Sequence, residues 1–151
     1  ARPDMAITTD VIVGFPGEGE EEFQETYDVM ERVGFDNAFV FRYSKRRGTP
    51  AAEMDDAIQV PERVKEERNQ ILLKLVSEIA LPRFKAHVGR EVEILCEGYS
   101  KTTKERLMGR TSQNRIVVFE GDFDRHTGQL FKVRVEDAKN FTLYGNADVM
   151  A

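Results

Sequence analysis

The chain has 151 residues, of which 40% are hydrophobic and 32% are charged, and its formal net charge is -5. This composition is typical of a folded globular protein with one or two domains, and no apolar run approaches the roughly 20 residues of a membrane-spanning helix. The single cysteine, Cys96, excludes an internal disulfide and a metal site built from several thiolates. Without a signal-peptide pattern at its start, the chain is expected to be cytoplasmic.

The first part of the chain predicts a β-α-β unit of the α/β class. Residues 6–15 are almost continuously apolar, which is typical of a strand covered on both faces. A turn at residues 14–17 precedes a helix with an acidic first turn and one apolar face, which we expect Gly34 to end. Residues 35–43 predict a second buried strand, parallel to the first. Two strands leave exposed edges, so we expect self-association through them.

A basic loop and a long helix connect this unit to the rest of the chain. Residues 44–52 form the basic loop, and Pro61 is well placed as the first residue of a helix. Its apolar positions lie on one face, with charges expected on the other. Pro82 is expected to kink or end this helix, because proline removes a backbone donor.

From about Val88 the hydrophobic pattern alternates with a period of two, which predicts short strands. A small five-stranded antiparallel β-barrel is therefore expected, so the whole fold is α/β followed by all-β. We place the boundary between residues 1–86 and residues 87–151. The later part holds ten basic and ten acidic side chains, so the net charge of -5 lies in the first. The five expected strands are residues 91–99, 106–111, 115–119, 130–136 and 141–144.

A basic hairpin within the expected barrel is the candidate nucleic-acid surface. On an acidic chain, such a cluster favours contact with phosphates, whereas the alternative is a charged rim that only keeps a strand edge soluble. Asn114 could bond a base or sugar, and Tyr99 or Phe119 could stack a base, although Phe119 fits the core better. The candidate RNA-binding residues are Lys101, Lys104, Arg106, Arg110, Asn114 and Arg115.

A second candidate site lies where the first strand ends, since ligands of α/β folds gather at the carboxyl ends of strands. Val13, Gly14 and Phe15 are the candidate cofactor residues there, with an ordinary strand-helix turn as the alternative. In the basic loop, Arg47 is the preferred candidate for a phosphate or carboxylate. Asp10, in the middle of the strand, is expected to be buried and to need a partner.

The cysteine and the two histidines are the remaining candidate residues. Cys96 is expected to be a core residue. His87 and His126 lack the spacing of metal ligands, so no metal site is expected.

Four separated runs, in order, resemble the C-terminal half of the radical-SAM tRNA methylthiotransferases, and the last ~65 residues resemble their TRAM domain. The resemblance covers nearly the whole chain. The four runs are TTDVIVGFPGE at residues 8–18, FRYSKRRGTPA at 41–51, VPERVKEERNQ at 60–70 and GRTSQNRIVVFEG at 109–121.

The resemblance implies the end of a radical-SAM (TIM-like) barrel followed by an OB-like, RNA-binding TRAM barrel. It implies two [4Fe–4S] clusters and S-adenosylmethionine as cofactors, with Val13, Gly14 and Phe15 near the adenosine. The implied reaction converts N6-isopentenyladenosine in tRNA to its 2-methylthio derivative, with the anticodon stem-loop as partner. In that family, one cluster cleaves the cofactor to a radical that abstracts hydrogen from the adenine.

One departure from the family pattern is decisive. The CxxxCxxC motif and the other cluster cysteines are absent, and Cys96 lies in the TRAM-like part. The chain is therefore interpreted as a C-terminal fragment that holds no cluster and is inactive alone. The alternatives are a stand-alone TRAM-type RNA-binding module, or sibling enzymes acting on N6-threonylcarbamoyladenosine in tRNA or on a ribosomal-protein aspartate. Arg110, Asn114 and Arg115 favour an RNA substrate over the last of these.

Overall fold

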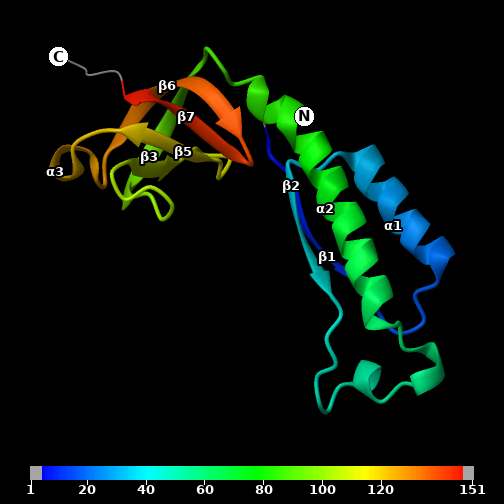
Figure 1. The fold of residues 1–151 in the computed structure, drawn as a ribbon. Coiled ribbons are helices and arrows are strands. Elements are labelled where there is room, and N and C mark those ends of the chain that lie inside the picture. The colour runs from blue at the N-terminus through cyan, green and yellow to red at the C-terminus, as the bar shows by residue number, and fades with distance from the viewer. Residues whose placement is uncertain (1–4, 148–151) are drawn as a thin grey trace. The chain divides into compact units, whose positions relative to one another are not determined.

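A computed structural model describes residues 5–147. These residues form two compact units, one of residues 6–79 and one that includes residues 80–147 (Figure 1). The expected functional boundary at residues 86 and 87 stays a prediction. No helix among the described residues is long and apolar enough to cross a membrane.

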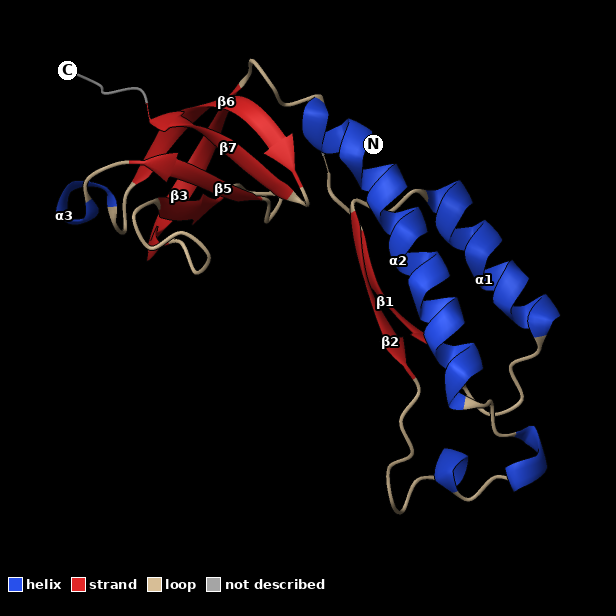
Figure 2. Cartoon of the chain, in the orientation of Figure 1, coloured by secondary structure: helices blue, strands red, loops and turns tan. Residues whose placement is uncertain are grey.

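The first unit contains the predicted β-α-β arrangement (Figure 2). Strand β1 (Thr8–Val13) pairs in parallel with strand β2 (Asn37–Arg42), and helix α1 (Glu20–Val33) connects them. Three glutamates occupy the first turn of α1, where they complement the helix dipole. Gly34 ends α1 in a left-handed conformation with φ 60°, as the sequence predicted.

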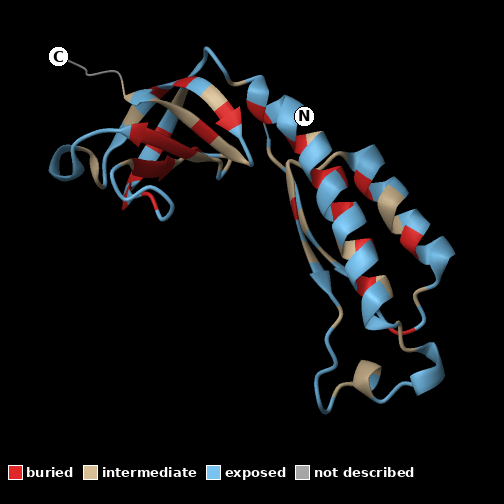
Figure 3. Cartoon of the chain, viewed as in Figure 1, coloured by how far each residue is buried: buried red, intermediate tan, exposed pale blue. Residues whose placement is uncertain are grey.

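One face of the two-stranded sheet is exposed, so the expectation that both faces are covered is wrong for the described residues. Figure 3 shows that β1 and β2 are coloured mostly as intermediate and exposed. Val13 and Ala38 are buried on one face, whereas the side chains of Ile12, Phe39 and Phe41 on the other face are 52–56% exposed. The strands are apolar on both faces, but α1 and α2 cover only one of them. Asp10 lies opposite Phe39 on the exposed side, so the expectation that it is a buried carboxylate is also wrong.

Two short 3-10 helices (Pro50–Ala52 and Asp56–Ile58) follow β2 and lead into helix α2 (Glu62–Lys85). Pro82 lies inside α2 and does not end it. Hydrogen bonding resumes directly, because the backbone N–H of Ala86 donates to the carbonyl of Pro82 over 3.0 Å. The last turn is also held by Phe84, which packs into the core of the second unit. Packing there offsets the amide donor that proline lacks.

The second unit is a closed five-stranded barrel with the strand order β3-β4-β5-β7-β6. All five strands were predicted, and the short helix α3 (Phe123–His126) was not. The expectation of a wholly antiparallel barrel is wrong, because β5 and β7 pair in parallel. Strand direction cannot alternate around a closed ring with an odd number of strands, so one parallel pair is unavoidable. The strands are β3 (Glu91–Tyr99), β4 (Leu107–Arg110), β5 (Ile116–Glu120), β6 (Leu130–Lys139) and β7 (Thr142–Ala147).

The barrel interior is filled by alternate residues of these strands, including Ile94, Leu107 and Val133. Cys96 is 1% exposed within this core, as predicted, and acts there as a small apolar side chain. The core fixes which strand residues point outward and therefore which side chains can meet a partner.

Candidate functional sites

The turn after β1 depends on a glycine at position 14. Gly14 has φ +74°, a conformation that favours glycine, and a Cβ atom there would collide with the Lys65 side chain from α2. The Gly14 backbone N–H donates to the Glu18 carboxylate over 2.9 Å. The turn is therefore closed by its own acidic residue and packed against α2.

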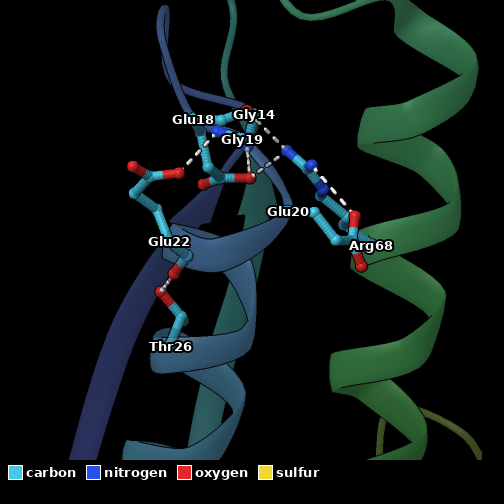
Figure 4. A network of polar contacts seen from close by, with 7 residues as sticks. All are labelled: Gly14, Glu18, Gly19, Glu20, Glu22, Thr26 and Arg68. Atoms are coloured by element: carbon cyan, nitrogen blue, oxygen red, sulfur yellow. Dashed lines mark hydrogen bonds and ion pairs between the residues drawn. The ribbon is translucent and has the colours of Figure 1, made fainter.

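Arg68 of α2 holds the same turn from the other side (Figure 4). Its Nη1 donates to the Glu18 carboxylate over 2.7 Å and to the Glu18 carbonyl over 2.9 Å. Its guanidinium also lies 5.2 Å from the centre of the Phe23 ring. Arg68 is 6% exposed, so the ion pair is shielded from water. This pair fixes the turn between β1 and α1.

Two neighbours of Arg68 on α2 hold β2. The Lys65 ammonium donates to the carbonyl of Tyr43 over 3.2 Å, and the Asn69 amide donates to the carbonyl of Val40 over 2.9 Å. The sequence pattern predicted that the charges of α2 lie on its solvent face, so these roles of Lys65 and Arg68 were not predicted. The signal was present, because positions 65, 68 and 69 extend the helical stripe of Leu72 towards the helix start.

An open pocket of about 510 Å³ lies beside the end of β1, on the exposed side of the sheet. The rings of Phe15 and Tyr43 meet edge to face there, with centroids 5.4 Å apart. Of the four predicted cofactor residues, only Phe15 lines the pocket. Val13 and Gly14 are buried, and Arg47 is exposed outside the lining. The pocket is lined by Ile12, Phe15, Phe41, Arg42, Tyr43, Ser44, Arg46, Thr49 and Ala51.

Lys101 and Lys104 are the two unengaged cations of the predicted RNA-binding set. Both are exposed in the loop between β3 and β4, and neither forms an ion pair with any residue in the range 5–147. The loop itself is ordered by hydrogen bonds from Ser100 N to the Arg106 carbonyl, at 2.8 Å, and from Arg106 N to the Thr103 carbonyl, at 3.0 Å. The loop is therefore held by backbone hydrogen bonds that do not involve either lysine ammonium group.

The predicted arginines are engaged with the barrel. Arg106 lies 3.2 Å from the Glu120 carboxylate, and Arg110 lies 3.2 Å from that of Glu97. Arg110 also donates to the Asn114 side-chain oxygen over 2.9 Å. These contacts place the two arginines and Asn114 on the outer surface while pairing much of their polar capacity. An incoming phosphate would compete with Glu97 and Glu120 for them.

Arg115 contacts residues at the C-terminal end of α2, whereas Lys101 and Lys104 lie in the β3–β4 loop. Its guanidinium lies 5.6 Å from the centre of the Phe84 ring, and its Nη1 lies 3.4 Å from His87 Nε2. Of the two candidate stacking residues, Phe119 is 1% exposed and belongs to the core, whereas Tyr99 is 57% exposed. The structure thus separates the predicted cluster into free lysines, paired arginines and one exposed ring.

The side chains of this chain do not fit an iron–sulfur cluster. Such clusters need several thiolates, and the only cysteine is buried in the barrel core. No group of three or more His, Cys, Asp or Glu residues in the described part of the chain could hold a metal ion.

Known proteins resemble both the barrel and the chain as a whole. Residues 85–147 match the TRAM domain model. The chain is 54% identical over 145 residues to a protein of Akkermansia muciniphila named tRNA-2-methylthio-N(6)-dimethylallyladenosine synthase, and 50% identical over 144 residues to one of the same name from Acetivibrio thermocellus. These matches cover 96% and 95% of this chain but 31% and 29% of the relatives, so the chain spans about 30% of their length. The predicted resemblance is confirmed: over nearly its whole length the chain is similar to part of proteins named tRNA-2-methylthio-N(6)-dimethylallyladenosine synthase, and its barrel matches the TRAM domain.

Proposed function

We propose that this chain is the tRNA-binding segment of a radical-SAM enzyme that adds a methylthio group to N6-isopentenyladenosine in tRNA. The observation that carries the tRNA-binding part is the pair of unengaged lysines, Lys101 and Lys104, on the outer surface of a TRAM barrel. The names of the relatives support the reaction and the choice of this nucleoside over N6-threonylcarbamoyladenosine. A cytoplasmic location, where tRNA is found, stays a prediction.

The electrostatics favour phosphate binding at the lysine loop. The chain carries a net charge of -5, so positive charge is not a general property of its surface. A lysine that already pairs with a carboxylate must lose that partner when it binds a phosphate, whereas Lys101 and Lys104 have no such partner among residues 5–147. Each phosphate contact releases condensed counterions, which is the main sequence-independent source of affinity for RNA.

The first unit supports a segment of an enzyme rather than a stand-alone RNA-binding module. A binding module has no need of a parallel β-α-β unit with an exposed apolar face and a lined pocket. The pocket fits S-adenosylmethionine in its chemistry, since Phe15 and Tyr43 offer ring surfaces to an adenine and Arg46 offers a cation to a carboxylate. That cofactor, when bound, supplies the methyl group and the radical of the family's reaction. Val13, Gly14 and Arg47 stay predicted members of this site, and the cluster thiolates must come from outside this chain.

The experiment that tests tRNA binding is a salt series on this chain with tRNA. The Lys101→Ala/Lys104→Ala variant is compared with wild type and with Arg63→Ala/Lys74→Ala, which removes the same charge from the exposed face of α2. The slope of log K against log salt is expected to shrink by about 1.4–1.8 for the loop variant, at roughly 0.7–0.9 per phosphate contact, and to stay unchanged for the control. Equal slopes for the two variants would contradict the assignment of the loop.

A further inference from the structure

We propose that Tyr99 and Phe123 form a stacking platform for one unpaired RNA base on the outer surface of the barrel. This inference rests on the proposed tRNA binding and names the part of the RNA that the surface takes. The sequence predicted Tyr99 or Phe119 as a stacking residue, without a second ring beside it. The pairing with Phe123, from a helix that the sequence did not predict, comes from the structure.

The two rings lie almost parallel, with centroids 4.6 Å apart and an angle of 13° between their planes. Tyr99 is nevertheless 57% exposed and Phe123 is 38% exposed. A stacked partner covers only one face of each ring, so the pair contributes to folding while leaving ring surface in water. A base that stacks on an outer face extends an arrangement that is already formed.

The fold holds the two rings from separate elements. Gly98 has φ +122°, a backbone conformation that residues with a side chain rarely adopt, and its Cβ position lies at contact distance, 3.4 Å, from the Phe123 ring. The register of β3 against β4 shifts between Cys96 and Gly98, directly before Tyr99. Such an irregularity re-aims the side chain that follows it.

The α3 segment is tied to β3 at its other end. The N–H of Gly128 donates to the Cys96 carbonyl over 2.9 Å, and the N–H of Cys96 donates to the Gln129 carbonyl over 3.0 Å. The side chain of Asp122 caps α3 by accepting from the N–H of Arg125 over 2.9 Å. Both rings are therefore fixed before a ligand arrives, which reduces the entropy lost on binding.

The charges beside the platform point to a nucleic acid as its occupant. Lys101 follows Tyr99 by two residues, so their Cα atoms are at most about 7 Å apart. Asp122 and Asp124 precede and follow Phe123 in the sequence, so the positive charge of the platform lies on the Tyr99 segment. A nucleotide that stacks on Tyr99 can place its phosphate towards Lys101. Aromatic side chains beside a basic backbone track are the usual way in which proteins hold single-stranded RNA.

The test uses this chain with an anticodon stem-loop RNA and with a fully paired RNA duplex of the same length. Three variants separate stacking from simple apolar contact: Tyr99→Ala, Tyr99→Leu and Tyr99→Phe. Leu130→Ala is the matched control, since Leu130 is a 68% exposed apolar residue on β6 of the same barrel. Tyr99→Ala and Tyr99→Leu are expected to weaken stem-loop binding by about 5- to 100-fold, the range for loss of one stacked base. Tyr99→Phe and the control should bind as wild type does.

The salt slope of Tyr99→Ala is expected to equal that of wild type, because no charge is removed. Binding of the duplex should be the same for all four variants, because a paired base cannot reach the rings. If Tyr99→Leu binds as well as wild type, or if duplex binding falls equally, the platform is refuted. If Tyr99→Ala binds normally while the lysine variant does not, the platform fails and tRNA binding stands. If wild type binds neither RNA, both proposals fail.

Discussion

The buried ion pair between Arg68 and Glu18 offers the sharpest test of how the first unit is held together. The change to make is Arg68→Met, which keeps much of the side-chain length and removes the charge. It leaves the Glu18 carboxylate, whose side chain is 11% exposed, without its cation. Removing one partner of a buried pair costs about 3–5 kcal/mol, far more than the pair itself contributes against an apolar replacement.

The contacts of Arg68 place the expected loss of unfolding free energy at the lower end of the range of about 3–5 kcal/mol. Arg68 makes two short hydrogen bonds to Glu18, of 2.7 and 2.9 Å, and bonds to charged groups contribute about 1.5–3 kcal/mol each. Its contact with Glu20 adds little, because that carboxylate is 84% exposed. The Nε of Arg68 is buried with no hydrogen-bond partner among residues 5–147, which reduces the net benefit of the wild-type residue. We expect a loss of about 3 kcal/mol in the free energy of unfolding.

The assay is urea unfolding followed by far-ultraviolet circular dichroism. Most of the helical signal comes from α1 and α2, so it reports mainly on the first unit rather than on the barrel strands. Glu18→Gln and the double variant complete a double-mutant cycle, with an expected coupling of about 2–3 kcal/mol. Lys74→Ala, which breaks the exposed pair with Glu78, is the control and should cost less than about 0.5 kcal/mol. A loss below about 1 kcal/mol for Arg68→Met, or additive single variants, would refute the reasoning.

Three further perturbations test the β1–α1 turn, a surface carboxylate and the pocket. Gly14→Ala should lower the free energy of unfolding in urea by more than Gly17→Ala does. Both sites have positive φ, which costs an alanine about 1–2 kcal/mol of strain, but only Gly14 is packed against the Lys65 side chain. Equal losses of stability for the two variants would contradict this role of packing. The Lys139 ammonium, followed by the Ala138 N–H, lowers the pKa of the Asp137 carboxyl below its usual range. Lys139→Ala should therefore raise this pKa in an NMR titration. Because the folded-state pKa is depressed, the stabilisation that this carboxylate contributes is present above its unfolded pKa and is lost as pH falls through the folded value. Addition of S-adenosylmethionine should shift the NMR signals of Phe15 in this chain, and the shift should be smaller in the Arg46→Ala variant. If millimolar S-adenosylmethionine causes no shift, the pocket is not part of the proposed cofactor site.

Self-association of the chain is a separate expectation that the structure leaves as a prediction. In the described residues, β1 and β2 pair only with each other. Each strand therefore keeps one unpaired edge, beside a sheet face that carries Ile12 and Phe41 in water. Sedimentation velocity over a concentration series would measure it.

The sequence by itself determined the elements and their order, because periodicity is a local property. Residues 91–99 alternate along one strand with Cys96 inward, and the structure has β3 over the same residues. Acidic residues before an apolar stripe, with Gly34 after it, located α1 to within a few residues. The resemblance also rested on local runs, and the family comparison confirmed it.

Only the tertiary structure decided which charges are free, since this depends on partners far away in sequence. Lys101 and Arg106 look alike in a basic run, but Arg106 meets Glu120 of the neighbouring strand β5, and Lys101 meets no described carboxylate. Arg68 reads as a solvated helix charge until Glu18, 50 residues earlier in the chain, is brought beside it. The parallel pairing of β5 with β7 follows from closure of the ring, and the stacking of Tyr99 on Phe123 follows from the docking of α3 on β3. Both are non-local outcomes of packing, which no window of sequence contains.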